Sequence, residues 1–543
     1  MFKRFTGLTT ALAGAALAIS VASAPPAAAQ LAIPSDAVSD CTLSESDLAG
    51  WFANGTIAAD GAVNAADSLT FPNDSDICDF YKWGAQMFLW LASPEADGVV
   101  MTGSEFFDVS PETYDSASKE TVRRLIPNDG SSALQLALRN QKFEEIEELA
   151  QAGSSGVLMS QGGSLLYYGV HVNEFYGYFL TAQKTADRGS YFGSIVDFAI
   201  GPNDVTQLQG FMQTAFPGVT LNSPQTLTME LKTSWVDAAT VDKDRYVTIQ
   251  ATVPKFSPIS SGDTTLWTPD GTEPKELALT GVHVVGTVLD HPEFVWATFE
   301  HVDNAPNNAF VYNTGSLANP TPKTQAYQAG GDFILRAAGA TPSDANKECM
   351  IQLDAKKAAA IGVPAGSIAA VDAGGKPVYG TNHSPRCEGG IVASSTVRDS
   401  PWGSANANDM SRMSSADQTA IALNNSRLIT LNADMIALLA DAGDVRANYV
   451  QNGGIWTNID SPRATDGLAP IPNKATADDL RGSLKLYNTT METYTYMDSF
   501  APNCFSCHAL FKSGGSYPKN SFAPFNLSHI YSEIIPLTPT AGD

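Results

Sequence analysis

Near its C-terminus the chain carries Cys504-Phe505-Ser506-Cys507-His508, a C-x-x-C-H sequence. Two thiols at this spacing can form thioethers with the two vinyl groups of one porphyrin, and the histidine beside them can bind the iron as its proximal ligand. The motif therefore predicts one covalent haem c, attached through Cys504 and Cys507, with His508 as the proximal iron ligand. No other feature constrains the fold as much, because the rest of the chain must form the walls around such a group.

The N-terminus has the pattern of an export signal. Lys3 and Arg4 precede an apolar run from Leu8 to Val21, and the small residues 27–29 offer a cleavage site before Gln30. We expect residues 1–29 to be a cleaved signal peptide and the mature protein to be periplasmic or secreted. No later apolar run has the length that a spanning helix needs, so we expect no membrane span.

Other interpretations of the C-x-x-C-H sequence are a chance occurrence, a zinc site or a redox dithiol. A zinc site needs a second Cys/His pair at close spacing, and none follows His508. No β-α-β pattern surrounds the motif, which disfavours a thioredoxin-like dithiol. The export signal favours haem, because bacteria attach haem c outside the cytoplasm.

The remaining cysteines, Cys41, Cys78, Cys349 and Cys387, predict disulfides, because an exported protein oxidises spare thiols. Pairing between nearest neighbours gives Cys41–Cys78 and Cys349–Cys387, although the sequence leaves the other two connectivities open.

The chain is strongly acidic. Its formal net charge is −25, and loss of Lys3 and Arg4 with the signal peptide makes it −27. Such a charge repels nucleic acid and anionic lipid, so we expect no nucleic-acid partner. It is compatible with a basic redox partner, but plain solubility is the interpretation that we favour.

At 543 residues the chain is long enough for two or three domains, and 43% hydrophobic residues indicate an ordinary globular core. We predict an α+β fold with helical N-terminal segments, a β-rich central part built from antiparallel hairpins, and a mainly helical C-terminal haem segment. The predicted regions are the signal peptide 1–29, a mixed α/β, β-rich domain at 30–410 and a helical haem c-binding region at 411–543.

Periodicity and turn residues locate the individual elements. The expected helices are 81–91, 131–152, 204–216, two helices between 415 and 443, and one that begins with the capping-box spacing at 489. The expected strands are 165–172, 227–236, 246–253, 277–289, 294–302, 331–337 and 484–487.

Two long β-patterned runs, 277–289 and 294–302, are separated by turn residues and predict a hairpin. If Leu289 pairs with Phe294, the antiparallel register places His283 directly opposite Glu300. This pair is a candidate acid/base or metal-binding site. The alternative, which we favour, is a buried structural hydrogen bond, because no third ligand stands at a diagnostic spacing.

Several blocks carry a resemblance to known proteins: 281–285 (Gly-Val-His-Val-Val), 295–304 (Val-Trp-Ala-Thr-Phe-Glu-His-Val-Asp-Asn), 446–449, 488–494 and the final 504–508. Together they resemble a family of exported bacterial proteins with one C-terminal C-x-x-C-H, identified as cytochrome c family proteins. The resemblance implies haem attachment and export, and it implies no particular reaction or substrate.

Two functions follow from a haem in an exported chain. One is electron transfer between periplasmic partners, and the other is a haem-dependent oxidoreductase whose β-rich part forms a pocket for a small-molecule substrate. The size of the chain favours the enzyme, whereas a single attachment motif argues against a dihaem peroxidase. A haem-based sensor or small-molecule-binding protein without turnover is the third alternative.

The sixth iron ligand has several candidates. His529 lies 21 residues beyond His508, after a Gly514-Gly515 loop, while Met491 and Met497 precede the motif. An open or water-bound iron is the remaining alternative. More distant methionines are Met410, Met413 and Met435.

Overall fold

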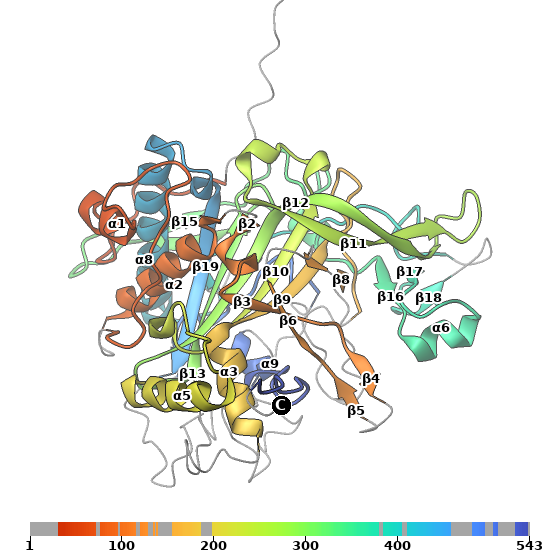
Figure 1. Cartoon of the computed structure of the whole chain (residues 1–543). Coiled ribbons are helices and arrows are strands. Elements are labelled where there is room, and N and C mark those ends of the chain that lie inside the picture. Colours follow the sequence, from red (N-terminus) through yellow and green to blue (C-terminus); the bar gives the residue numbers. More distant parts are fainter. Residues whose placement is uncertain are drawn as a thin grey trace, which may run out of the picture.

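The computed structural model describes residues 31–71, 76–95, 98–115, 120–128, 134–135, 137–138, 155–185, 198–378, 384–403, 410–457, 480–494, 503–508 and 527–540 (Figure 1). The signal peptide expected at 1–29 lies outside these ranges.

A large, mostly antiparallel sheet forms the centre of the molecule (Figure 1). Its long strands are rich in β-branched and aromatic residues, and β13 is buried along its whole length because both of its faces are covered. In spatial order the main path is β20 (Leu480–Gly482), β19 (Tyr449–Thr457), β13 (His291–His301), β12 (Leu266–Val288), β10 (Met229–Asp237), β9 (Tyr167–Asn173), β3 (Phe106–Val109) and β6 (Leu125–Pro127). The α+β class and the β-rich centre with antiparallel hairpins are thus confirmed.

The two faces of this sheet have different covers. On one face Phe299 of β13 stacks on Phe88, with ring centroids 4.5 Å apart, and Ala297 packs against Gly84. Both partners belong to α2 (Ile77–Leu91), which lies beside α8 (Ser415–Asp441) and, further out, α1 (Glu45–Trp51) (Figure 1). Side chains alternate along a strand, so Trp296, Thr298 and Glu300 must point to the opposite face.

That opposite face, which we call the polar face because it also carries Glu230, Lys232 and His283, is covered by two helices from the first half of the chain together with C-terminal residues. The cover includes α3 (Glu174–Lys184), α5 (Pro202–Ala215) and the short α9 (Cys504–His508). One apolar cluster joins the sheet to these segments; it includes Val285, Phe294, Trp296, Phe198, Phe505, Leu527 and Ile530.

The outer half of β12 and its partner β11 (Thr248–Pro258) extend from the sheet as an arm (Figure 1). The arm carries its own small apolar cluster. Its other elements are β16 (Met350–Gln352), α6 (Ala355–Ile361), β17 (Ile368–Val371) and β18 (Pro377–Val378). The remaining short strands are β1 (Pro94–Glu95), β2 (Gly98–Val99), β4 (Thr113–Asp115), β5 (Glu120–Val122), β7 (Leu134–Gln135), β8 (Ala137–Leu138), β14 (Phe310–Asn313) and β15 (Pro322–Gln325).

Both expected disulfides are present. Cys41 is bonded to Cys78 in the first turn of α2, and Cys349 is bonded to Cys387 in the arm. The nearest-neighbour pairing is therefore confirmed, and each bridge closes a loop of similar length, 37 and 38 residues.

Several predicted elements are confirmed, and several are wrong. The helices at 81–91 and 204–216 appear as α2 and α5, and the four long strands at 227–302 appear as β10 to β13. The two helices expected at 415–443 are one helix, α8, because no Gly or Pro interrupts residues 415–441. Residues 331–337 and 484–487 are not strands, and the described part of the expected 131–152 helix forms the short strands β7 and β8.

The mainly helical character expected for 411–543 is not supported by the residues described there. After α8 they form β19, β20, a series of turns at 489–494 and the five-residue α9. The capping-box spacing at 489 thus starts turns rather than a helix in the described residues 489–494. Because β19 pairs with β13, the two regions predicted at 30–410 and 411–543 share one sheet. Their boundary as a domain limit stays a prediction.

The predicted hairpin register is wrong by two residues. Val288 pairs with His291 across a two-residue turn in which Asp290 has φ 66°, and the register shifts between Gly286 and Val288. Between these pairs β13 runs four residues, from His291 to Val295, where β12 runs two, from Gly286 to Val288, and this irregularity changes every pairing beyond it. His283 consequently lies opposite Thr298, and Glu300 lies opposite Gly281, so His283 and Glu300 are not a directly opposed pair.

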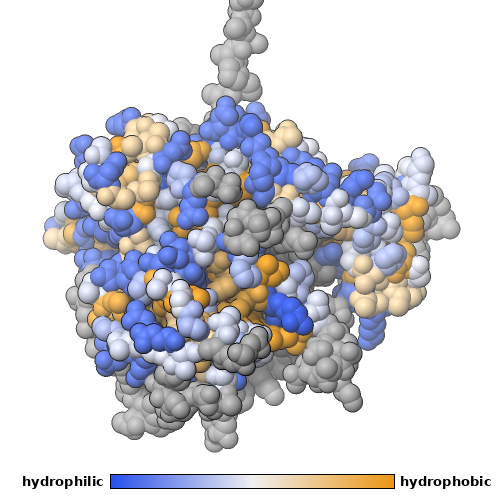
Figure 2. Space-filling model, viewed as in Figure 1, coloured by the Kyte–Doolittle hydropathy of each residue, from blue (hydrophilic) through white to orange (hydrophobic). Residues whose placement is uncertain are grey.

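On the face seen in Figure 2 hydrophilic residues lie between hydrophobic ones over most of the described surface, and hydrophobic residues gather in the lower centre of the view. The exposed large hydrophobic residues of the described part are scattered: Val38, Ile126, Val219, Ile259, Leu317 and Leu484. Among the helices that the structure describes, none combines the length and hydropathy that crossing a bilayer would require.

Candidate haem-binding site

The C-x-x-C-H motif forms α9, which lies on the polar face of the sheet. Phe505 is fully buried, and its ring centroid is 6.0 Å from that of Trp296 on β13. The same tryptophan lies 4.4 Å from the His508 ring, and Cys504 packs against the same apolar cluster. The motif is thus held by an aromatic wall that belongs to the sheet, not to its own segment of chain.

His508 has the hydrogen bond of a histidine prepared to bind a metal. Its Nδ1 is 2.6 Å from the carbonyl oxygen of Leu527. A carbonyl can accept but not donate, so Nδ1 carries the proton and Nε2 keeps its lone pair. Histidines that bind metals through Nε2 have this same backbone partner at Nδ1. Burial lowers the pKa of His508 well below its usual value, with His529, Lys232 and His283 adding to the effect.

His529, the candidate distal ligand, lies directly beside His508. Their rings are almost parallel, at 13°, with centroids 4.0 Å apart. Two histidines that bind one iron from opposite sides must each point a nitrogen at the metal, whereas these rings lie face to face. The structure brings the two residues together, and His529 would have to turn or shift to become the sixth ligand.

The segment that carries His529, residues 527–537, is fixed by many contacts with the sheet and α3. Ser528 donates a hydrogen bond of 2.5 Å to Glu230 on β10, and its hydroxyl is 2.8 Å from the Tyr176 hydroxyl. Lys184 Nζ donates to the carbonyls of Tyr531 and Ile534, and Arg123 pairs with Glu533 at 2.6 Å. The position of His529 is therefore set by residues far away in the sequence.

The methionine rivals lie elsewhere, or outside the described residues. Met491 is fully buried in a separate apolar cluster with Leu158, Leu166 and Leu335. Met497 lies outside the described residues. Met435 belongs to the core on the α2 side of the sheet, and Met410 and Met413 pack near Val311. The described residues thus bring His529 to His508 and leave Met491 in another cluster.

His283 contacts a carboxylate, although not the expected one. Its Nε2 is 2.9 Å from Oε1 of Glu492, and both side chains are partly exposed, at 16% and 18%. The other carboxylate oxygen of Glu492 accepts from the backbone N–H of Asn488, 2.8 Å away. An imidazole–carboxylate pair therefore exists on the polar face, between β12 and the block 488–494.

Glu300 is completely buried and is bound on all sides. Arg398 Nε donates to it at 3.0 Å, the backbone N–H of Thr489 at 2.7 Å, and the Thr489 hydroxyl and the Asn452 amide donate as well. A carboxylate with this many donors and no exposed surface fits the structural interpretation. Its acid/base role, like that of His283, stays a prediction.

One group of interacting side chains was not predicted from the sequence. His171 Nδ1 is 2.8 Å from Asp108, and its Nε2 is 3.1 Å from the Thr233 hydroxyl, in the order of a nucleophile, base and carboxylate. His171 and Thr233 have no exposed surface, and Asn128 also binds Asp108. A substrate could not reach the hydroxyl, so this arrangement holds the β3, β9 and β10 strands together.

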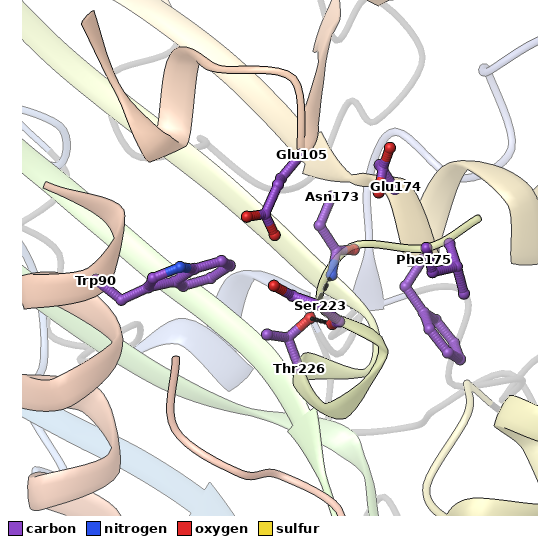
Figure 3. A pocket seen from close by; sticks show the side chains of 8 residues that line it. Trp90, Glu105, Asn173, Glu174, Phe175, Ser223 and Thr226 are labelled. Atoms are coloured by element: carbon purple, nitrogen blue, oxygen red, sulfur yellow. Dashed lines mark hydrogen bonds between the residues drawn. The ribbon is translucent and has the colours of Figure 1, made fainter. Parts of the chain in front are cut away.

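Within the described residues no group of three His, Cys, Asp or Glu side chains could hold a metal ion by itself. The pocket in Figure 3 is no alternative site. Its cavity volume is about 10 Å³, which is at most the room that one water molecule needs. It is lined by Trp90, Glu105, Asn173, Glu174, Phe175, Leu221, Ser223 and Thr226, remote in the sequence from the motif.

The residues present at α9 fit a haem c: two cysteines in the motif, a histidine with Nε2 available, a second histidine beside it, and an aromatic wall. Of the sequence blocks that resemble cytochrome c family proteins, 295–304 supplies Trp296 beside α9, whereas Arg446 of the block 446–449 binds α2 on the other face, and the resemblance stays a prediction. The chain matches no family model, no curated protein and no solved structure, so its function has to be argued from these residues and their geometry.

Proposed function

We propose that the protein is an exported, monohaem c-type cytochrome with a redox function. The proposal rests on Cys504, Cys507 and His508, and the observation that carries it is the hydrogen bond from His508 Nδ1 to the Leu527 carbonyl. That bond orients the imidazole and leaves Nε2 as an iron ligand. When bound, the haem would supply a one-electron Fe(III)/Fe(II) couple. The two disulfides support a periplasmic or secreted location.

Electron transfer is the function that the geometry favours. The ring centroid of His529 lies 4.0 Å from that of His508, so a second protein ligand is near and would bind the iron once its ring turned or shifted out of the stacked arrangement. Trp296, Phe505 and Leu527 belong to one apolar cluster that would keep water away from a haem bound at α9 and would raise its reduction potential. The acidic surface suits a basic redox partner in the periplasm.

A haem-dependent oxidoreductase acting on a small molecule is the second candidate. The specific observation in its favour is the partly exposed His283–Glu492 pair, which lies on the polar face of the sheet, as α9 does. Such a pair could move a proton to or from a substrate bound at an open iron position.

The first experiment tests haem attachment. Wild-type protein, exported in a host that matures cytochromes c, should keep its haem after denaturation and acid–acetone extraction. A Cys504→Ala/Cys507→Ala variant should lose it, because no thioether can form. The matched control, Cys41→Ala/Cys78→Ala, also lacks two cysteines but keeps the motif and should retain the haem stain. Wild-type protein that stains no more than the motif variant would refute the proposal.

The second experiment separates the candidate functions. The visible spectrum of the reduced protein should be low-spin and unchanged by carbon monoxide if two protein ligands hold the iron. A spectrum that shifts with carbon monoxide would favour an open iron and thus the oxidoreductase, or a sensor if no turnover follows.

A further inference from the structure

The residue directly before His529 links the C-terminal segment to the sheet. The Ser528 hydroxyl donates to the Glu230 carboxylate on β10 at 2.5 Å, and the Tyr176 hydroxyl of α3 lies 2.8 Å from the same serine oxygen. A serine hydroxyl carries one proton, and Ser528 donates it to Glu230, so the Tyr176 hydroxyl is the donor in the second contact. A chain of hydrogen bonds thus runs from Tyr176 through Ser528 to Glu230.

The centre of this chain is withdrawn from water. Ser528 has 3% of its surface exposed, and Tyr176 has none. A buried hydroxyl that loses its partner cannot replace it freely with water, so these bonds hold Ser528 more firmly than exposed bonds would.

The register of the sheet places this anchor in line with the aromatic wall of the motif. Glu230 pairs with Val285 on β12, and Val285 pairs with Trp296 on β13. Directly opposed residues of antiparallel strands point to the same face, so Glu230 and Trp296 lie in one row, about 10 Å apart. Trp296 contacts the ring of His508 at 4.4 Å, while Glu230 holds the residue before His529. One row of the sheet therefore positions both segments.

We propose that Ser528 is the positioning residue for His529 as the sixth iron ligand. The inference rests on the proposed function, since it requires a haem at α9. Ser528 fixes the backbone beside His529, so the imidazole reaches the iron by turning about its own side-chain bonds. Without this anchor the backbone must be ordered as well, which makes ligation less favourable.

The test measures the apparent affinity of the reduced, full-length holoprotein for carbon monoxide, which binds only the molecules whose sixth position is open. Ser528→Ala should raise this affinity about tenfold, because a hydrogen bond to a charged group is lost. Ser528→Thr keeps the hydroxyl and should stay close to wild type. Tyr176→Phe keeps the ring but removes one donor, and should raise the affinity about 2- to 10-fold. It serves where Ser528→Ala disturbs folding.

Two controls separate positioning from general stability. Ser532→Ala is the matched control, because Ser532 belongs to the same segment but is exposed. In a His529→Ala background, Ser528→Ala should leave the affinity for carbon monoxide unchanged, because no sixth ligand remains to be positioned. A serine with only a structural role would act equally in both backgrounds.

Outcomes for this inference and for the proposed function are separable. Absence of covalent haem from the wild type refutes the proposed function, and the inference with it. Haem in the wild type, with an unchanged affinity in both Ser528→Ala and Tyr176→Phe, overturns the role of Ser528 alone. An equal gain with and without His529 overturns it too, as does a wild-type affinity that His529→Ala leaves unchanged. A gain in Ser528→Ala that disappears in the His529→Ala background supports it.

Discussion

Replacement of Glu300 by Gln should destabilise the protein severely. The substitution keeps the shape of the side chain but removes its charge, which leaves the guanidinium of Arg398 buried without a counter-charge. Both partners are almost wholly inaccessible, at 4% for Arg398 and 0% for Glu300. Breaking a buried ion pair by removing one partner costs about 3–5 kcal/mol. Two further donors, the Thr489 N–H and hydroxyl, lose part of their acceptor as well.

The assay is equilibrium unfolding in urea with the disulfides intact, followed by tryptophan fluorescence. Lys243→Ala is the control, because its ion pair with Glu276 is exposed, with 54% and 35% of the side chains accessible. Exposed pairs contribute about 0–1 kcal/mol, so the control should unfold close to wild type. Equal unfolding midpoints for Glu300→Gln and the control would refute the assignment of Glu300 as the structural link between β13 and 488–494.

A double substitution separates loss of the pair from loss of packing. Arg398→Met in the Glu300→Gln background removes the unpaired cation and should recover part of the lost stability. A double variant that is less stable than the single one by the full cost of Arg398→Met would show that the two residues do not interact.

Three further predictions concern the sixth iron ligand, the buried carboxylate of Glu230 and the disulfides. His529→Ala should convert a low-spin iron to a high-spin iron that binds carbon monoxide, whereas the volume-conserving Met491→Leu should leave the spectrum unchanged. If the oxidised protein shows the charge-transfer band of sulfur ligation at the red end of its visible spectrum, and this band survives His529→Ala, the sixth ligand is a methionine. Burial raises the pKa of Glu230 to about 7, so the folded protein binds this proton more tightly than the unfolded chain does. The free energy of unfolding should therefore fall as the pH rises from about 4.5 to 7. Urea midpoints measured between pH 5 and pH 8 should show this fall in the wild type and not in Glu230→Gln. Cys41→Ala/Cys78→Ala should lower the free energy of unfolding by about 2–5 kcal/mol, and peptide mapping of the non-reduced wild type should recover both disulfides; free thiols there would contradict the pairing.

Sequence patterns correctly predicted those helices, strands and disulfides that depend mainly on residues close together in the sequence. The apolar run that forms α2 and the alternation in β10 to β13 can be read without tertiary knowledge, as can the nearest-neighbour cysteine pairs. The C-x-x-C-H spacing predicts a chemistry that depends on five adjacent residues, and haem attachment there stays a prediction.

Properties that depend on distant residues were not predictable. The hairpin turn is two residues long instead of the expected four, and the register shift between Gly286 and Val288 recovers only part of the resulting displacement, so His283 lies opposite Thr298 rather than Glu300; no turn residue predicts that shift. The actual partners of Glu300, Arg398 and Thr489, lie 98 and 189 residues away in the sequence. Likewise the pairing of His283 with Glu492 requires the fold of the 488–494 block onto the sheet.

The sheet itself belongs to the candidate haem site. The described C-terminal pieces have little regular structure of their own, and α9 is five residues long, far below the length at which a helix is stable alone. Each piece is fixed by a different sheet residue: α9 by Trp296, the 488–494 block by Glu300, and the segment with His529 by Glu230. The position of His508 relative to His529 is therefore decided by β10 and β13, more than 200 residues upstream. If the motif binds haem as proposed, this dependence would explain why a single C-x-x-C-H motif is joined to so large a β-rich part.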